Sequence, residues 1–255
     1  MTAGTYLYCV VLAPPARRAR VRGLPGTGPI RLLDADGGLY LVAADAPLSR
    51  YGEAAIKRGL GDLEWVSRAA MAHEQVVESF AGAEAVLPMK LFTIFSSDAR
   101  ALAHVRGEQK RIDAAVKRVA KHDEWSVRVV LDRARTERKA APPPASGTRN
   151  RTGVAYLARK KARRDAAAEL AERARDIVAA LYDRLGARAR LSRRRSASEL
   201  PVENGPLLLD AAFLVPRSRT GTFRTQAARE ARALARQGYG MTLTGPWPPY
   251  SFVQD

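Results

Sequence analysis

The sequence predicts an α+β protein with two domains. A small α+β domain is expected over residues 1–123, and a ferredoxin-like βαββαβ domain with a proline- and aromatic-rich C-terminal extension over residues 124–255. Three observations support this prediction. The chain of 255 residues is long enough for two small domains. The hydrophobic period changes from two to three or four near residue 62 and returns to two at residue 124. Beyond residue 124 the patterns follow the order strand, helix, strand, strand, helix, strand.

Strands are expected at the start of the first domain. Residues 6–12 alternate aromatic and aliphatic side chains and end before a pair of prolines, which favours a strand. Residues 30–33 and 39–43 are also rich in β-forming side chains, and the segment between them contains two glycines. Two such segments around a glycine-containing turn predict a β-hairpin.

Two helices are expected next. The first begins after Asp62, a residue type that caps helices well, and ends before Gly82. Its expected inward face consists of Leu63, Val66, Ala70, His73, Val77 and Phe80. After a short apolar segment over residues 85–95, a second helix is expected to begin near Ser97 or Asp98. The apolar face of this second helix consists of Leu102, Val105, Ile112, Val116 and Val119.

The second domain is expected to begin with a strand in which Trp125, Val127, Val129 and Leu131 share one face. The basic segment over residues 133–152 contains three consecutive prolines, so it is predicted to be a loop. A long helix over residues 153–185 and a short strand over residues 191–195 follow.

The last three elements of the second domain are the clearest. Residues 207–215 are apolar on both faces, apart from Asp210, which favours a central strand. A helix over residues 222–237 follows and ends before Gly238. Residues 241–244 are the last expected strand.

The net charge is unusual. Lys and Arg number 43 and Asp and Glu 26, which gives +17. Such a surplus predicts attraction to nucleic acids, anionic membranes or acidic proteins. Clusters of lysine and arginine over residues 159–164 and of arginine over residues 193–195 could contact phosphates, which makes a basic nucleic-acid-binding module the alternative function. Few aromatic side chains lie near these clusters, so a solvated face or a dock for an acidic partner is favoured instead.

Residue patterns typical of enzymes and cofactor sites are missing from the sequence. Cys9 is the single cysteine, so neither an internal disulfide nor a cysteine-based zinc site is expected. The three histidines, His73, His104 and His122, form no metal-binding spacing, and no phosphate-binding loop or nucleophile elbow occurs. We therefore predict no catalytic, cofactor-binding or metal-binding residues, no cofactor and no small-molecule substrate. Without a membrane-spanning stretch or a signal peptide, a cytoplasmic location is expected.

The C-terminal segment over residues 245–252 differs in kind from the rest of the chain. Its three prolines fix φ and remove backbone donors, so the segment is expected to leave the sheet as an extended tail. Trp247, Tyr250 and Phe252 give this tail large apolar faces. The tail could fold back and cover its own sheet or the other domain. It could also dock a partner, and these three side chains are then the candidate partner-binding residues.

Several motifs resemble one family. The ending Gly-Pro-Trp-Pro-Pro-Tyr-Ser-Phe is similar to that of the gas vesicle protein L/F family, GvpL/GvpF. The aromatic start at residues 6–8, the pair His73-Glu74 and the segment over residues 86–93 resemble further motifs of the family. So do residues 153–157 with the two lysines that follow, and residues 212–215. One departure is Leu91-Phe92-Thr93, where the family often has Phe-Gly-Thr.

This resemblance implies a function without catalysis. It implies two domains with a ferredoxin-like C-terminal domain. It also implies a minor vesicle component or assembly factor that binds the small hydrophobic shell-forming protein and other accessory proteins of the vesicle. The expected location is then the cytoplasm and the gas vesicle, and no specific nucleic acid or membrane is expected as a partner.

Overall fold

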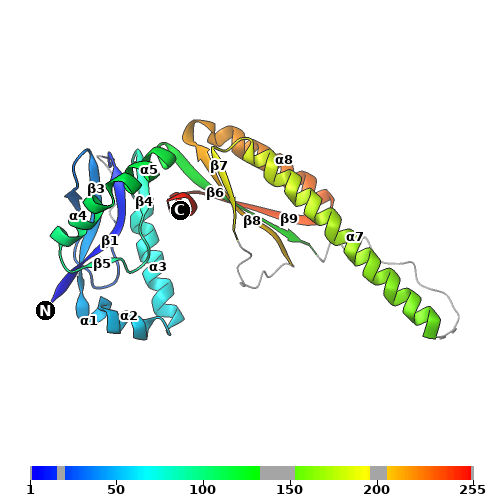
Figure 1. The fold of residues 1–255 in the computed structure, drawn as a ribbon, viewed down its shortest axis with the longest axis horizontal. Helices are drawn as coiled ribbons and strands as arrows, with labels where there is room; N and C mark the ends of the chain where they lie inside the picture. Colours follow the sequence, from blue (N-terminus) through cyan, green and yellow to red (C-terminus); the bar gives the residue numbers. More distant parts are fainter. Residues whose placement is uncertain (1, 16–20, 133–152, 196–205, 254–255) are drawn as a thin grey trace. The chain divides into compact units, whose positions relative to one another are not determined.

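The computed structural model describes residues 2–15, 21–132, 153–195 and 206–253 (Figure 1). The fold is a mixture of helices with two antiparallel sheets. The chain divides into two compact units. The first unit contains Met1–Glu124 together with Pro246–Asp255, and the second contains Trp125–Gly245. Among the described residues, no helix has the length and apolar character needed to cross a membrane.

The sheet of the first unit is built around β1 (Ala3–Leu12), which is buried along almost its whole length. The strand order is β2-β3-β1-β4, and the short β5 (Ile94–Phe95) also pairs with β1. The expected hairpin is confirmed: β2 (Arg31–Asp34) and β3 (Leu39–Pro47) pair antiparallel, and the turn between them contains three residues with positive φ. β4 (Ala85–Pro88) pairs with the second half of β1.

Five helices of the first unit lie between and after these strands: α1 (Leu48–Tyr51), α2 (Glu53–Gly59), α3 (Leu63–Glu78), α4 (Asp98–Gly107) and α5 (Gln109–Val119). Asp62 caps α3 as expected, because its side chain accepts hydrogen bonds from the backbone N–H groups of Glu64 and Trp65. Ser97 caps α4 in the same way. The second predicted helix is in fact two helices, because the backbone at Glu108 leaves the helical region.

The inward face of α3 differs from the predicted one. His73, Val77 and Phe80 are buried as expected, but Leu63 is 80% exposed and Ala70 is also exposed. The helix is rotated because Trp65, its largest side chain, turns toward Tyr51 and Phe92. The side chains four, eleven and fifteen positions beyond Trp65 follow it into the core: Ala69, Val76 and Phe80.

The second unit contains the sheet order β7-β8-β6-β9. Its elements are β6 (His122–Leu131), α7 (Gly153–Gly186), β7 (Leu191–Arg194), β8 (Leu207–Pro216), α8 (Thr220–Arg236) and β9 (Tyr239–Trp247). Apolar side chains from β6, α7, β8 and α8 form its core. The loop predicted over residues 133–152 lies outside the described residues.

Asp210 interrupts the apolar pattern of β8 for an electrostatic reason. It is buried, and its carboxylate oxygens lie 3.0 Å from Arg195 Nη2 and 3.2 Å from Arg128 Nε. A buried carboxylate is tolerated when it is paired in this way. One member of the basic cluster over residues 193–195, Arg195, is therefore paired with a buried carboxylate and is itself partly buried.

The tail does not leave the sheet where the prolines suggested. β9 continues past Gly245 to Trp247 and includes Pro246. This is possible because β9 is the end strand of its sheet, and a proline on an end strand need not cost a ladder hydrogen bond. Gly245 has φ 131, which suits a glycine at this bend.

Candidate functional site

Residues from two of the motifs in the first unit, the aromatic start of β1 and the His73-Glu74 pair, lie together in the core of that unit. β1 contributes Tyr6 and Tyr8, and α3 contributes His73. Tyr6 Oη lies 2.8 Å from His73 Nδ1 and accepts a hydrogen bond from the backbone N–H of Phe92 at 3.2 Å. Which of these two atoms donates depends on the tautomer of the His73 ring. Tyr8 Oη accepts a hydrogen bond from the backbone N–H of Leu24.

The electrostatics of this cluster favour neutral groups. Burial lowers the pKa of His73 to about 4, although a backbone hydrogen bond at Met89 acts in the opposite direction. Burial also raises the pKa values of Tyr6 and Tyr8 above their ordinary range. At neutral pH all three rings are uncharged. Their arrangement therefore suits a hydrogen-bonded core that joins β1, α3 and the segment before β5, rather than acid–base chemistry.

The backbone of Phe92 explains the departure from the family motif. Phe92 has φ 64, in the left-handed region that favours glycine. Its ring stacks on Trp65 with centroids 5.0 Å apart and planes at 18°, and it also lies near Tyr51. The chain thus keeps the glycine-like turn and occupies the position with an aromatic side chain that packs on α3.

The aromatic tail residues lie in the first unit. Phe252 is 3% exposed, and its carbonyl accepts a hydrogen bond from Arg118. Tyr250 is half-buried and packs against the core that contains Tyr6 and Cys9. Trp247, at the end of β9, is half-buried as well. Of the three predicted partner-binding residues, the structure thus brings Tyr250 and Phe252 into contact with their own unit.

A buried carboxylate holds the tail. Glu124 is 3% exposed and accepts two hydrogen bonds of 2.7 Å, from the backbone N–H and the hydroxyl of Ser251. Burial, with Glu78 and Glu124 nearby, raises the pKa of Glu74, and burial likewise raises that of Tyr250. The last residues of the fold are therefore fixed both by apolar packing and by charge-assisted hydrogen bonds.

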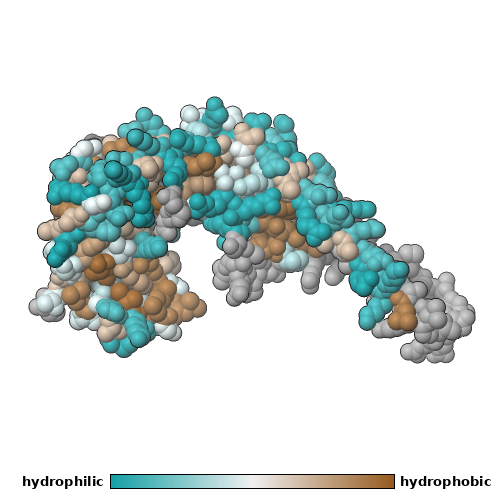
Figure 2. Space-filling model, in the orientation of Figure 1, coloured by the Kyte–Doolittle hydropathy of each residue, from teal (hydrophilic) through white to brown (hydrophobic). Residues whose placement is uncertain are grey.

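An apolar surface on α2 and α3 was missed by the sequence reasoning. Leu60, Leu63 and Met71 are 60%, 80% and 63% exposed, and we call them the α3 patch. Figure 2 shows apolar residues gathered at the lower left, over the region of α2 and α3. Periodicity alone placed Leu63 inside the protein. Only the position of Trp65 on the neighbouring face could have signalled that Leu63 and Met71 point outward.

Metal binding finds no support in the part of the chain that the structure describes, since no group of three or more His, Cys, Asp or Glu side chains comes together there. Cys9 is fully buried in β1, and burial raises the pKa of its thiol well above the ordinary range. An inert core thiol is the consequence.

Comparisons with known proteins agree with one another. A family model described as "Gas vesicle synthesis protein GvpL/GvpF" matches residues 4–254. Gas vesicle protein L of Streptomyces sp. (strain CB03234) is 29% identical over 258 residues, which cover 99% of this chain and 94% of that protein. The crystal structures of the gas vesicle protein GvpF from Anabaena sp. PCC7120 and from Microcystis aeruginosa have TM-scores of 0.69 and 0.66 against this chain. Each is 17% identical and covers 99% of both chains, which shows a shared fold.

Proposed function

Because the chain belongs to the gas vesicle synthesis protein family GvpL/GvpF, we propose that it is a non-catalytic accessory protein of gas vesicle assembly. In this role it binds the hydrophobic shell-forming protein in the cytoplasm and assists its incorporation into the vesicle wall. The observation that supports this proposal is the α3 patch, where one large apolar side chain just after α2 and two on α3 are exposed.

The physical reason for such a surface is the state of the shell subunit before assembly. A subunit that builds a gas-filled wall exposes apolar area, and exposed apolar area promotes uncontrolled association. Burying an exposed Leu or Met side chain in a contact contributes roughly 1.5–3 kcal/mol when burial is complete. Three exposed side chains of this size are enough for a reversible contact, although part of this energy offsets the entropy lost on association.

A triple substitution tests the proposal. In Leu60→Ser/Leu63→Ser/Met71→Ser, we expect affinity for the purified shell protein to fall at least about tenfold, the loss that corresponds to roughly 1.4 kcal/mol. The matched control is Leu157→Ser/Leu191→Ser, which removes exposed leucines from α7 and β7 of the second unit. The control should bind normally. Unchanged binding by the triple variant, or equal loss in the control, would contradict the proposal.

The tail offers a second candidate contact. Trp247, Tyr250 and Phe252 stay the candidate partner-binding residues, and we propose a test at Trp247, which is half-buried at the end of β9. Trp247→Ala separates two roles. Lost stability with normal binding of the shell protein would assign Trp247 to closure of its own fold. Retained stability with lost binding would assign it to the partner.

The second unit has the features of a ferredoxin-like domain, and we infer that it is one. Its four strands come in the chain order β6, β7, β8, β9 and lie in the sheet as β7-β8-β6-β9. A helix follows the first strand and another follows the third. This is the arrangement of the split βαβ motif. An experimental structure in which the four strands lie in a different order would contradict the inference.

A further inference from the structure

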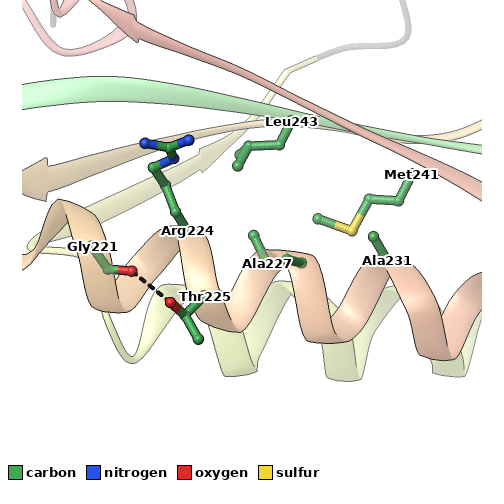
Figure 3. Close-up of a pocket in the computed structure, with 8 residues that line it drawn as sticks. Gly221, Arg224, Thr225, Ala227, Ala231, Met241 and Leu243 are labelled. Atoms are coloured by element: carbon green, nitrogen blue, oxygen red, sulfur yellow. Dashed lines mark hydrogen bonds between the residues drawn. The ribbon is translucent and has the colours of Figure 1, made fainter.

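A groove runs along the edge of the second unit, between α8 and the end strand β9. It has a volume of about 470 Å³. The helix lines it with Ala227, Ala228 and Ala231, and the strand lines it with Met241 and Leu243. Figure 3 shows Ala227 and Ala231 facing the same space as Met241 and Leu243, with Arg224 at one end. The small side chains on the helix leave room that an added apolar side chain would fill.

The charge around this groove has one sign. The exposed charged side chains of α8 are all arginines: Arg224, Arg229, Arg232 and Arg236. The helix's only acidic residue, Glu230, is 7% exposed and is held by both Arg184 and Gln226. Arg232 has no carboxylate partner among the described residues, and Arg224 contacts only the ring of Trp125. The guanidinium groups of Arg224 and Arg232 can therefore pair with carboxylates of an acidic partner.

The charge is also uneven along the chain. Residues 125–245 contain 26 Lys or Arg and 11 Asp or Glu, so they hold +15 of the net +17. The remainder of the chain contains 17 Lys or Arg and 15 Asp or Glu. The groove therefore lies on the strongly basic part of the molecule. Attraction of an acidic segment to it follows from charge complementarity.

The backbone of β9 favours an extended occupant over a helical one. β9 pairs with β6 on one side and ends the sheet on the other. An end strand presents backbone N–H and C=O groups that another strand can pair with. Along β9, Met241 and Leu243 share the face that lines the groove, whereas Thr242 and Thr244 are exposed. A strand added beside β9 would place alternate side chains toward α8 in the same way.

We propose that this groove docks an extended acidic segment of a partner protein. The segment adds to β9 as a further strand, its alternate apolar side chains pack against the alanines of α8, and its carboxylates pair with Arg224 and Arg232. The inference goes beyond the proposed function, because it concerns a different surface and does not require the partner to be the shell protein.

The test uses the full chain and a fluorescent peptide in which glutamate alternates with valine. We expect saturable binding that is lost when lysine replaces glutamate in the peptide. Arg224→Glu/Arg232→Glu should weaken binding at least about tenfold. Ala228→Trp, which fills the groove without changing charge, should weaken it as much. Hydrogen exchange of the backbone amides over residues 239–245 should slow on binding, as expected for a new strand.

Two matched controls keep the result specific. Arg175→Glu reverses one exposed arginine on α7, and Ala180→Trp adds an indole at an exposed alanine of the same helix. Both should bind the peptide nearly as the unaltered chain does. Equal loss in the controls, a lysine peptide that binds equally well, or unchanged amide exchange in β9 would overturn the proposal.

A nucleic-acid role for the same surface predicts a different pattern. A single-stranded oligonucleotide attracted by charge would lose affinity in every charge-reversal variant, including Arg175→Glu, and would be indifferent to Ala228→Trp. If the acidic peptide behaved in that manner too, the groove would have no specific role and the proposal would fail. If Ala228→Trp weakened the peptide alone, the proposal would be supported.

Discussion

At the scale of single residues, Phe92 combines a backbone conformation that favours glycine with a side chain that glycine lacks. A left-handed φ costs a non-glycine residue about 1 kcal/mol or slightly more. The stacking of its ring on Trp65 opposes that cost. Gly59 assists the stack, since a Cβ at that position would lie 2.6 Å from Trp65 Cε3. The unfavourable backbone conformation is that of Phe92, but the stacking that opposes its cost also depends on Trp65 and Gly59.

A pair of substitutions at Phe92 separates these two effects. Phe92→Ala removes the ring and keeps the unfavourable φ, whereas Phe92→Gly removes both. We expect both variants to be less stable than the unaltered chain, with Phe92→Gly more stable than Phe92→Ala by roughly 1 kcal/mol. Urea unfolding monitored by tryptophan fluorescence measures the order. If Phe92→Ala were the more stable of the two, the left-handed backbone at this position would be wrong.

Protonation of His73 is expected to make the free energy of unfolding fall as the pH is lowered. Burial lowers its pKa to about 4 in the folded chain, below the value of about 6.5 in an unfolded chain. Between these pH values the unfolded state binds more protons. Stability is therefore fully present above pH 6.5 and declines as the pH falls toward 4, by up to roughly 3 kcal/mol. Because nearby carboxylates titrate in the same range, the comparison with His73→Gln is the informative one.

The measurement for His73 is the free energy of unfolding across this pH range. His73→Gln can keep a hydrogen bond with Tyr6 but cannot titrate. We expect its stability to fall less steeply with decreasing pH than that of the unaltered chain. Parallel curves for the two proteins would mean that His73 is not held neutral by burial.

At the scale of elements, α3 shows what periodicity can and cannot predict. The helix, its N-cap and half of its inward face follow from the sequence, because caps and spacing are local properties. The rotation of the helix does not, because it depends on which side chain finds the larger partner elsewhere in the chain. Trp65 meets Tyr51 and Phe92, so Leu63 faces outward. The exposure of the α3 patch results from tertiary packing, so it cannot be predicted from the local sequence pattern.

The tail is an element in which sequence and structure agree only in part. Its prolines and aromatic residues identify it, but they cannot tell that β9 continues through Pro246 or that Glu124 binds Ser251. Ser251→Ala should lower stability by about 1 kcal/mol, because it removes one of the two hydrogen bonds to a buried carboxylate. Thermal unfolding measures the loss. Ser97→Ala, which removes an exposed cap hydrogen bond, is a control for hydroxyl deletion at a comparable cost.

For the Ser251 variant, local exchange is the sharper measurement. Amide exchange over residues 250–253 should quicken in Ser251→Ala and stay unchanged in Ser97→Ala. Equal exchange in the two variants would show that packing of Tyr250 and Phe252 alone fixes the tail.

At the scale of the whole molecule, charge and apolar surface are divided between the units. The second unit is strongly basic, whereas the first is close to neutral and carries the α3 patch. The total charge and the order of strands and helices along the chain could be predicted from the sequence, since they depend on composition and hydrophobic period. Which residues make up the first unit could not be predicted from the sequence. Its last ten residues are separated from the others by the entire second unit, and a contact at that separation leaves no local pattern.

This division predicts a different response of the two units to salt. Self-repulsion destabilises a compact unit with net charge +15, and ions screen it. In calorimetry of the full chain, added sodium chloride should raise the melting temperature of the second unit more than that of the first. Val77→Ala and Phe213→Ala, which remove buried side chains from one unit each, assign the transitions. Equal shifts, or a larger shift in the transition that Val77→Ala lowers, would contradict the expectation.

The hydrogen bonds between Glu124 and Ser251 have a consequence for how the protein is made. The second unit is an insertion into the first, since the chain departs at residue 124 and returns at residue 246. During translation every residue of the insertion emerges before Tyr250 and Phe252 do. The core of the first unit therefore lacks the side chains of Tyr250 and Phe252 at the time when the inserted unit can already fold. A truncation just before the tail would leave an intact insertion within a first unit that lacks the side chains of Tyr250 and Phe252.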